Sequence, residues 1–273
     1  MSNKTIKIRL DEELVEQGYF LTTEDALRAI MEGRVSSHGE RLTQAGKQVP
    51  HGIDIHVKGT KTSEIGYVGR GGLKLAGALK NFCIDVNGKR CLDAGCSTGG
   101  FTDCLLKHGA SHVVAIDVGY GQFDWSLRND NRISLFERTN ICNVTPQDIG
   151  GACDLIVADV SFTSIEHIAE ALVLLMNNKA ELCSLVKPQF EANSHEVEEG
   201  GIVRDINVHK RVLMDVVKTC DANGLCVQDV CVSPITGAKG NREYFVYAIK
   251  SLQSHTSPDI NTKIERICGI GTV

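Results

Sequence analysis

The chain has 273 residues, of which 42% are hydrophobic, 23% charged and 5% aromatic. This length fits one large domain or a medium domain with a small one, and the composition excludes a disordered chain, a collagen-like fibre and a coiled coil. Taken over the whole chain, the formal net charge of −5 argues mildly against a nucleic-acid-binding protein.

The sequence predicts neither export nor membrane insertion. Its longest unbroken aliphatic run, residues 171–176, is far shorter than the roughly 20 residues of a membrane-spanning helix, and residues 1–10 lack the apolar core of a signal peptide. The eleven cysteines show no C-x-x-C spacing, so we expect most of them to be buried free thiols in a reducing compartment. We therefore expect a cytoplasmic protein without a membrane or metal partner.

Residues 1–60 are expected to form a small separate domain of helices and short strands. An amphipathic stretch opens at Arg9-Leu10-Asp11. A second helix begins with an N-cap and an acidic first turn in Thr22-Thr23-Glu24-Asp25 and stops at Gly33. Short strands follow near Val35 and over residues 53–57.

This stretch resembles the small RNA-binding domain first described in a ribosomal protein, the S-four domain. The resemblance rests on the run Arg9-Leu10-Asp11, on a second helix that ends in Gly33-Arg34-Val35, and on the turn His38-Gly39-Glu40. It implies that the second helix and the turn lie against structured RNA, where arginine side chains contact phosphates. The candidate RNA-binding residues are Arg9, Arg28, Arg34, Arg41 and Arg70.

Residues 61–80 are expected to form a basic linker that leads into a helix reaching about Phe82. Residues 58–80 carry five basic side chains against the single acid Glu64, a local charge of +4. Because RNA binding requires a local basic face rather than a basic chain, this stretch bears more on function than the total charge. The helix residues expected to pack inward are Leu73, Ala76, Gly77 and Leu79.

Residues 81–250 alternate strands and helices, which predicts an α/β domain with a mostly parallel sheet and helices on both faces. Strands are expected at 90–93, 112–117, 133–137, 154–159, 182–186, 225–232 and 243–249, and helices at 101–108, 164–177 and 208–222. Two successive strands at the end of this region imply an antiparallel last strand. Residues 251–273 form a polar C-terminal tail to which no element is assigned.

A glycine-rich turn, residues 93–102, follows the first strand of this domain and opens a helix. The turn lacks the G-x-G-x-x-G spacing of dinucleotide sites, but its glycines allow close backbone approach and the helix start offers free N–H groups. Asp117 ends the next strand, where a carboxylate can accept hydrogen bonds from both hydroxyls of an adenosine ribose. Together these features predict a site for a nucleoside cofactor.

S-adenosylmethionine suits this site better than a dinucleotide, because it has no pyrophosphate and carries a cation and an amino-acid tail. Asp93, at the end of the first strand, can accept that tail, and Asn140, after the third strand, can contact the edge of an adenine ring. The candidate cofactor-binding residues are Asp93, Gly95, Ser97, Thr98, Gly99, Gly100, Phe101, Asp117, Asn140 and Asp159.

Four polar residues on different elements form the candidate catalytic group, namely Lys74, Asp159, Lys187 and Glu243. Asp159 and Lys187 follow two predicted parallel strands, where α/β sheets build their sites. A ribose 2′-hydroxyl is a very weak acid, and a lysine can remove its proton where burial and a second cation favour the neutral amine. We expect Lys187 to be that base or its immediate partner, with Asp159 and Glu243 orienting the lysines.

The chain resembles the TlyA family, often called hemolysin A, whose catalytic domain is related to FtsJ-type RNA 2′-O-methyltransferases. The resemblance implies a Rossmann-like methyltransferase fold, a Lys-Asp-Lys-Glu tetrad on the four residues above, and methylation of cytidine ribose in ribosomal RNA within ribosomal subunits. Gly69 and Cys96 depart from the family's usual residues without removing a catalytic group. The matching runs are residues 70–75, 97–103, 117–122, 137–140, 159–162, 186–191, 233–237 and 240–243.

Two other functions are weighed against this one. The name hemolysin implies a membrane role, but the sequence shows no membrane span and no strongly basic amphipathic helix. An inactive cofactor-binding, RNA-binding protein is disfavoured because all four tetrad positions keep polar side chains of the right type.

One further hypothesis concerns the long segment 191–205, which is rich in glutamate and glycine. Long segments beside a site are often lids, so we expect this one to close on cofactor or RNA; otherwise it is a mobile surface loop.

Overall fold

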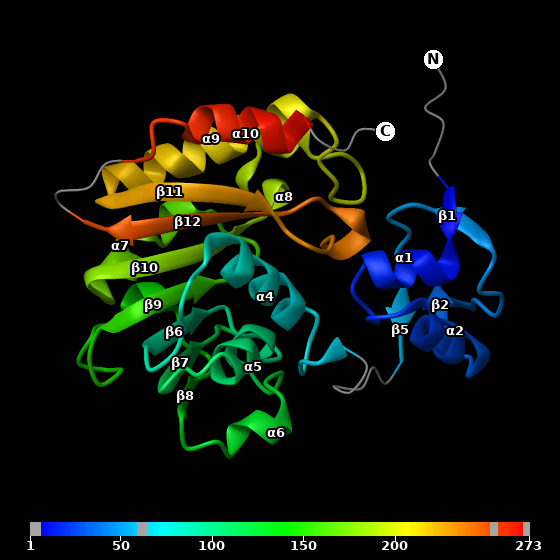
Figure 1. Cartoon of the computed structure of the whole chain (residues 1–273), viewed down its shortest axis with the longest axis horizontal. Coiled ribbons are helices and arrows are strands. Elements are labelled where there is room, and N and C mark those ends of the chain that lie inside the picture. Colours follow the sequence, from blue (N-terminus) through cyan, green and yellow to red (C-terminus); the bar gives the residue numbers. More distant parts are fainter. Residues whose placement is uncertain (1–6, 59–64, 252–255, 270–273) are drawn as a thin grey trace.

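The computed structural model describes residues 7–58, 65–251 and 256–269, which form an N-terminal unit (residues 7–57) beside a larger sheet unit (Figure 1). In the N-terminal unit, β1 (Lys7–Arg9) pairs antiparallel with β4 (Gln48–Pro50). A second small sheet has the order β3 (Glu40–Arg41), β2 (Val35–Ser37), β5 (His56–Val57). Helices α1 (Leu10–Glu16) and α2 (Thr23–Met31) share one apolar core with these strands.

The structure confirms both helices expected in this unit. The Thr22 side chain accepts a hydrogen bond from the backbone N–H of Asp25, as an N-cap residue should. The strand expected over residues 53–57 is limited to β5, and the pair of β1 with β4 was not predicted. Strands of two or three residues are too short for the alternation of apolar and polar residues to mark them.

The sheet unit is built on seven strands in the order β11-β12-β10-β9-β6-β7-β8. β6 (Arg90–Ala94), β7 (His112–Ile116), β8 (Ile133–Phe136), β9 (Cys153–Ala158) and β10 (Met176–Val186) run parallel. β12 (Tyr244–Lys250) is antiparallel to β10 and to β11 (Leu225–Val232), so the predicted fold class is confirmed. The strand order reverses between β6 and β9, and ligand sites in such sheets lie at the carboxyl ends of the strands beside this point.

Helices cover both faces of this sheet. α4 (Gly71–Phe82) and α5 (Gly100–Lys107) pack on one face, while α7 (Ala169–Leu174), α9 (Ile206–Ala222) and α10 (Ile260–Gly269) pack on the other. The short elements are α6 (Trp125–Arg128), α8 (Pro188–Glu191) and the 3₁₀ turns η1 (Ile141–Asn143), η2 (Ile165–His167), η3 (Ser194–Glu196) and η4 (Ala238–Gly240). Among the described residues, none of these helices has the length and apolar character that crossing a bilayer requires.

Two helix predictions were wrong in part. The helix expected over 164–177 is shortened to η2 and α7, because Met176 already belongs to β10 and pairs with Cys153 of β9. On α4, Leu79 is buried as expected, but Leu73, Ala76 and Gly77 are only half-buried. The buried face instead follows the helical spacing of Leu75, Ala78, Leu79 and Phe82, and it includes Lys74.

The C-terminal region contains α10, to which the sequence assigned no structure. Four residues of α10 are buried at helical spacing and join the core that this helix shares with α9 and β11: Ile260, Ile264, Ile267 and Cys268. All eleven cysteines are free, and nine of them are buried, which confirms the expectation that most are core residues.

The two units meet where two glycines touch. A Cβ atom added to Gly240 would lie 2.4 Å from the Cα of Gly52, and both residues have the positive φ that favours glycine, +77° and +76°. The buried carboxylate of Glu13 holds this turn by accepting a hydrogen bond from the Gly52 N–H at 2.8 Å. The N-terminal unit therefore sits directly against the segment 234–240, which leads to Glu243.

Candidate active site

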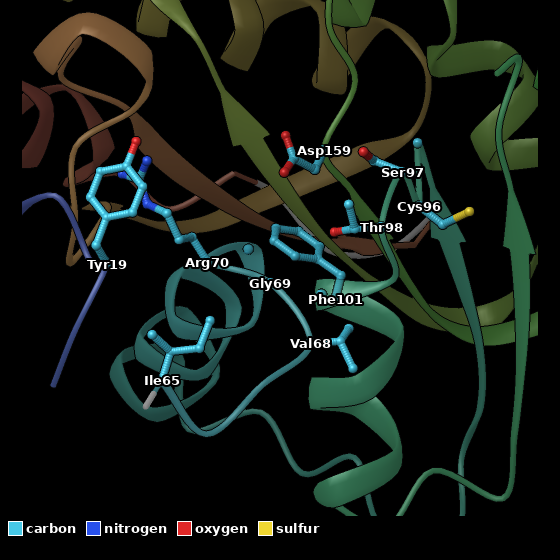
Figure 2. Close-up of a pocket in the computed structure, with 13 residues that line it drawn as sticks. Tyr19, Ile65, Val68, Gly69, Arg70, Cys96, Ser97, Thr98, Phe101 and Asp159 are labelled. Carbon is cyan, nitrogen blue, oxygen red and sulfur yellow. The ribbon is translucent and has the colours of Figure 1, made fainter. Parts of the chain in front are cut away.

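A cavity of about 370 Å³ opens beside the turn that joins β6 to α5 (Figure 2). Its wall is formed by this turn, by Asp159 after β9, by the segment 65–71 before α4, and by Tyr19 of the N-terminal unit. Six of the predicted cofactor residues line it: Gly95, Ser97, Thr98, Gly100, Phe101 and Asp159.

The turn is held in a conformation that its glycines make accessible. Gly95 has a φ of +83°, and a Cβ atom there would lie 2.7 Å from the carbonyl oxygen of Asp159. The Ser97 N–H donates to Asp117 Oδ2 at 2.7 Å, and the Gly119 N–H donates to Asp117 Oδ1 at 2.6 Å. Asp117 therefore ties the end of β7 to the glycine-rich turn.

The other predicted cofactor residues lie outside the cavity wall. Asp93 and Gly99 are buried beneath the turn. Asp117 stands half-buried beside it, and Asn140 is exposed, with its side chain accepting a hydrogen bond from the Cys142 N–H. The sequence predicted that all of these residues lie at one sheet edge. In the structure some line the cavity, Asp93 and Gly99 are buried behind its wall, and Asp117 and Asn140 lie outside it.

Three carboxylates give this region a negative field. Burial raises the pKa of Asp93 to about 7, the hydrogen bond from Thr102 opposes this rise, and the charges of Asp159 and Asp117 add to it. Asp93 Oδ1 has no hydrogen-bond partner among the described residues. Such a field favours a cationic ligand and disfavours a pyrophosphate, so the residues present fit S-adenosylmethionine better than a dinucleotide.

The variant Asp93→Asn is expected to reduce the pH dependence of stability. A carboxyl group with a pKa of about 7 in the folded state and 3.8 in the unfolded chain takes up a proton on folding, so its contribution is full below about pH 4 and is lost as the pH rises through 7. In the wild type this group lowers the free energy of unfolding by up to about 4 kcal/mol between pH 4 and pH 8.

Chemical denaturation at pH 5 and pH 8 measures this effect. The difference in unfolding free energy between the two pH values should be smaller for Asp93→Asn than for the wild type, whereas the exposed control Asp54→Asn should leave it unchanged. An identical pH dependence in Asp93→Asn and the wild type would show that Asp93 is ionised in the folded protein.

The four candidate catalytic residues form two ion pairs. Lys74 Nζ lies 2.6 Å from Glu243 Oε2, and both residues are buried, with 9% and 2% of their surface exposed. Lys187 Nζ lies 2.6 Å from Asp159 Oδ1 and donates a hydrogen bond to Ser161 Oγ at 2.7 Å. Burial of this extent is unusual for lysine and glutamate unless they are paired.

Strand register explains why these residues meet. Val186 of β10 pairs with Tyr244 of β12, so Lys187, which follows Val186, lies near Glu243, which precedes Tyr244. β9 runs parallel to β10 on its other side and places Asp159 at the same edge. Lys74 comes from the buried face of α4 and completes the group. Residues 74, 159, 187 and 243 are thus neighbours although they lie far apart in the sequence.

Phe162 is a feature of the site that the sequence reasoning missed. Its side chain is 91% exposed, and its φ of +62° is rare for a bulky residue. Its ring lies 5.0 Å from that of Phe190, whose ring centroid is 5.8 Å from Lys187 Nζ. The position of Phe162 in the run Asp159-Val160-Ser161-Phe162 was the available signal, but exposure and backbone strain could not be read from it.

The five candidate RNA-binding arginines have different surroundings. Arg28 and Arg41 are exposed, and Arg9 is half-exposed beside Asp11. Arg34 has 15% of its side chain exposed and donates to the Lys58 carbonyl. Arg70 lies in the cavity wall, stacks on the Tyr19 ring at 4.3 Å and donates to the Thr236 carbonyl at 3.0 Å (Figure 2). Arg34 and Arg70 thus have protein partners where the sequence suggested phosphate contacts.

The long segment 191–205 is fastened to the chain that leads to Glu243. Asn241 Nδ2 donates to the Gly201 carbonyl at 2.8 Å, and Lys239 Nζ donates to the Gly200 carbonyl at 2.9 Å. Closure of this segment on a ligand stays a prediction, and these contacts are the ones that closure would rearrange.

Three comparisons place the chain among known proteins. A sequence model of the FtsJ-like methyltransferases matches residues 67–250. The 16S/23S rRNA (cytidine-2′-O)-methyltransferase TlyA of Mycobacterium tuberculosis is 44% identical over 241 residues, which cover 88% of this chain and 89% of that protein. Hemolysin A of Brachyspira hyodysenteriae is 40% identical over 243 residues, 89% of this chain and 100% of its own length. A solved structure of a Streptococcus thermophilus protein named as a hemolysin covers 97% of this chain and 96% of its own, with 36% identity and a TM-score of 0.74.

Proposed function

The chain belongs to the FtsJ-like methyltransferases, and within them to the TlyA family, and from this premise we propose that it methylates the ribose 2′-hydroxyl of a cytidine in ribosomal RNA. The observation that carries the proposal is the two lysine–carboxylate contacts, one buried and one half-buried, at the sheet edge beside the glycine-rich cavity. Ribosomal RNA as substrate implies action in the cytoplasm, where ribosomes are assembled.

The cavity is proposed as the cofactor site. When bound there, S-adenosylmethionine supplies a methyl group already activated by its sulfonium. The backbone of the turn residues Gly95–Phe101 would lie against the cofactor. Asp117 would accept hydrogen bonds from the ribose hydroxyls of the cofactor, with the lone pairs that the N–H groups of Ser97 and Gly119 leave free. Asp93 would act from beneath the turn through its unpartnered Oδ1.

Lys187 is proposed as the base that takes the proton of the 2′-hydroxyl. Asp159 and Ser161 fix its amine at 2.6 and 2.7 Å, so that the remaining direction of the nitrogen is available to the substrate. Asp159 then stabilises the ammonium that proton transfer produces. Lys74 and Glu243 form a second ion pair at the same sheet edge, which holds Lys74 beside the proposed base. Orientation of hydroxyl and methyl group supplies much of the remaining acceleration.

The N-terminal unit is proposed as the RNA-binding domain, within residues 1–60, joined by the basic linker 61–80 to a methyltransferase domain at 81–250. Arg28 and Arg41 are exposed there and can reach phosphates. A separate RNA-binding unit favours a folded target within a ribosomal subunit over a bare strand. Phe162 can stack on the base of the target nucleotide, because exposed aromatic side chains next to a catalytic group commonly hold unstacked bases in RNA-binding proteins.

Methyl transfer from radiolabelled S-adenosylmethionine to separated, unmethylated ribosomal subunits tests this function. We expect incorporation into RNA of one or both subunits, at a cytidine whose 3′ phosphodiester becomes resistant to alkali, because a 2′-O-methyl group blocks alkaline cleavage. The cofactor's affinity is measured in parallel by fluorescence of Trp125, the one tryptophan of the chain, which follows Asp124, whose N–H donates to the Thr98 carbonyl in the turn. Cofactor binding without incorporation into either subunit would favour an inactive binding protein.

A further inference from the structure

Two loops leave the sheet side by side at the active site and are joined along their length. We call residues 159–165, after β9, and residues 187–191, after β10, the clasp. The contacts that span it run outward from the catalytic pair. Lys187 contacts Asp159 and Ser161, Phe190 packs on Phe162, and Glu191 contacts Ser164 and Ile165.

Glu191 closes the outer end of the clasp. Its Oε2 accepts a hydrogen bond from Ser164 Oγ at 2.6 Å, and its Oε1 accepts one from the Ile165 N–H at 2.9 Å. These donors stand at the start of η2, where backbone N–H groups lack partners within the helix. Burial raises the pKa of Glu191, and the two hydrogen bonds oppose that rise. The hydrogen bonds therefore offset part of the cost of burying this carboxylate.

Phe162 needs such a support. With 91% of its side chain exposed, it is not held by burial, yet its backbone adopts the left-handed region that bulky residues avoid. The backbone around it is anchored on one side by Ser161, through Lys187, and on the other by Ser164 and Ile165, through Glu191. Removing the outer anchor would let the residues between relax to an unstrained conformation.

We infer that Glu191 is a positioning residue for methyl transfer, which holds residues 161–165 so that Phe162 and the Ser161–Lys187 contact keep the geometry that the target nucleotide requires. This inference rests on the proposed function for its effect on catalysis. The hydrogen bonds by which Glu191 holds Ser164 and Ile165, which we call the brace, do not depend on that function, and their effect on local stability can be measured separately.

The test compares Glu191→Ala, Glu191→Gln and the control Glu166→Gln in the full-length protein. Glu166 is an exposed carboxylate in η2, so its variant changes the same charge nearby and leaves the brace intact. In Glu191→Ala we expect amide hydrogen exchange in residues 159–168 to rise about tenfold or more. The kcat/KM for subunit RNA should fall up to about 100-fold, mainly through kcat, since misplacing reacting groups by an ångström carries a penalty of this order.

Glu191→Gln should recover most of both properties, because its amide oxygen can accept from Ile165 and its amide nitrogen can donate to Ser164 Oγ. Affinity for S-adenosylmethionine should stay within about twofold of wild type in all three variants, because Glu191 does not line the cofactor cavity. In a Phe162→Ala background, Glu191→Ala should add little further loss, since the two residues act through one element.

Several outcomes would overturn the inference. These are unchanged exchange in residues 159–168 of Glu191→Ala, faster exchange with an unchanged kcat/KM, or an equal loss in Glu166→Gln. Should the wild type methylate no RNA at all, the proposed function fails, while the exchange contrast still decides whether Glu191 braces the clasp.

Discussion

Replacing Lys187 with alanine is expected to reduce methyl transfer by about three orders of magnitude or more, while cofactor affinity stays within about twofold of wild type. The variant removes the proposed proton acceptor, the amine that Asp159 and Ser161 contact. Lys187 is absent from the wall of the cofactor cavity, so its loss should leave that wall in place. Single-turnover methylation of ribosomal subunits gives the rate, and Trp125 fluorescence gives the affinity.

Two further variants sharpen this result. Lys187→Arg keeps the positive charge but cannot release its proton near neutral pH, so it should be as inactive as the alanine variant if Lys187 is the base. Lys80→Ala, an exposed lysine at the end of α4, should behave as wild type. Substantial activity in Lys187→Arg would show that the residue acts through charge alone, and parallel loss of cofactor binding in Lys187→Ala would contradict the role assigned here.

Removing Glu243 is expected to have the largest effect on stability. Glu243→Ala leaves the Lys74 ammonium without a partner at a position where only 9% of the residue is exposed. Breaking a buried ion pair in this way destabilises a protein by about 3–5 kcal/mol, which in a chain of this size lowers the melting temperature by about 10 °C. Thermal denaturation followed by circular dichroism measures the shift, and methyl transfer should be lost in the same protein.

The double variant Lys74→Met/Glu243→Leu separates stability from activity. It replaces both charges with apolar groups of similar size, so it should regain most of the lost stability and still transfer no methyl group. Asp215→Ala, which removes two exposed ion pairs on α9, with Arg211 and Lys218, should change stability by less than about 1 kcal/mol. If Glu243→Ala melts at the wild-type temperature, Lys74 is not dependent on this partner, and the two-pair description of the site is wrong.

The sequence predicted those parts of the fold that local patterns determine. Alternating strands and helices, an N-cap at Thr22 and the glycine-rich turn at 93–102 each leave a signal within a few residues, and the structure has all of them. The spacing of Asp159 and Lys187 after their strands was likewise enough to predict a shared edge, because carboxyl ends of parallel strands meet there. Lys74 and Glu243 were also singled out as polar residues on separate elements, but no local pattern specifies that they pair.

What the sequence could not predict depends on contacts between distant residues. Tyr19 stacks on Arg70 across two structural units. This contact leaves no signal in the sequence, so Arg70 was assigned to RNA binding rather than to the cavity wall. The buried stripe of α10 is interspersed with polar residues, so it was not recognised until the helix was seen against α9. Glu191 was grouped with the segment 191–205 that is expected to close on a ligand, because its two donors lie 26 and 27 residues earlier in the chain.

The contact of Gly52 with Gly240 sets a limit on how this protein can be recombined. A methyl group on Gly240 would lie 2.4 Å from the Cα of Gly52, and one on Gly52 would lie 3.2 Å from the Cα of Gly240, so a larger side chain at this point forces the two backbones apart or strains a positive φ. The two units are consequently not interchangeable modules, despite being separate in sequence and in core. A chimera that exchanges the N-terminal unit must also exchange segment 234–240 for one that matches the new unit. Because this segment leads directly to Glu243, the exchange also changes the chain next to the active site.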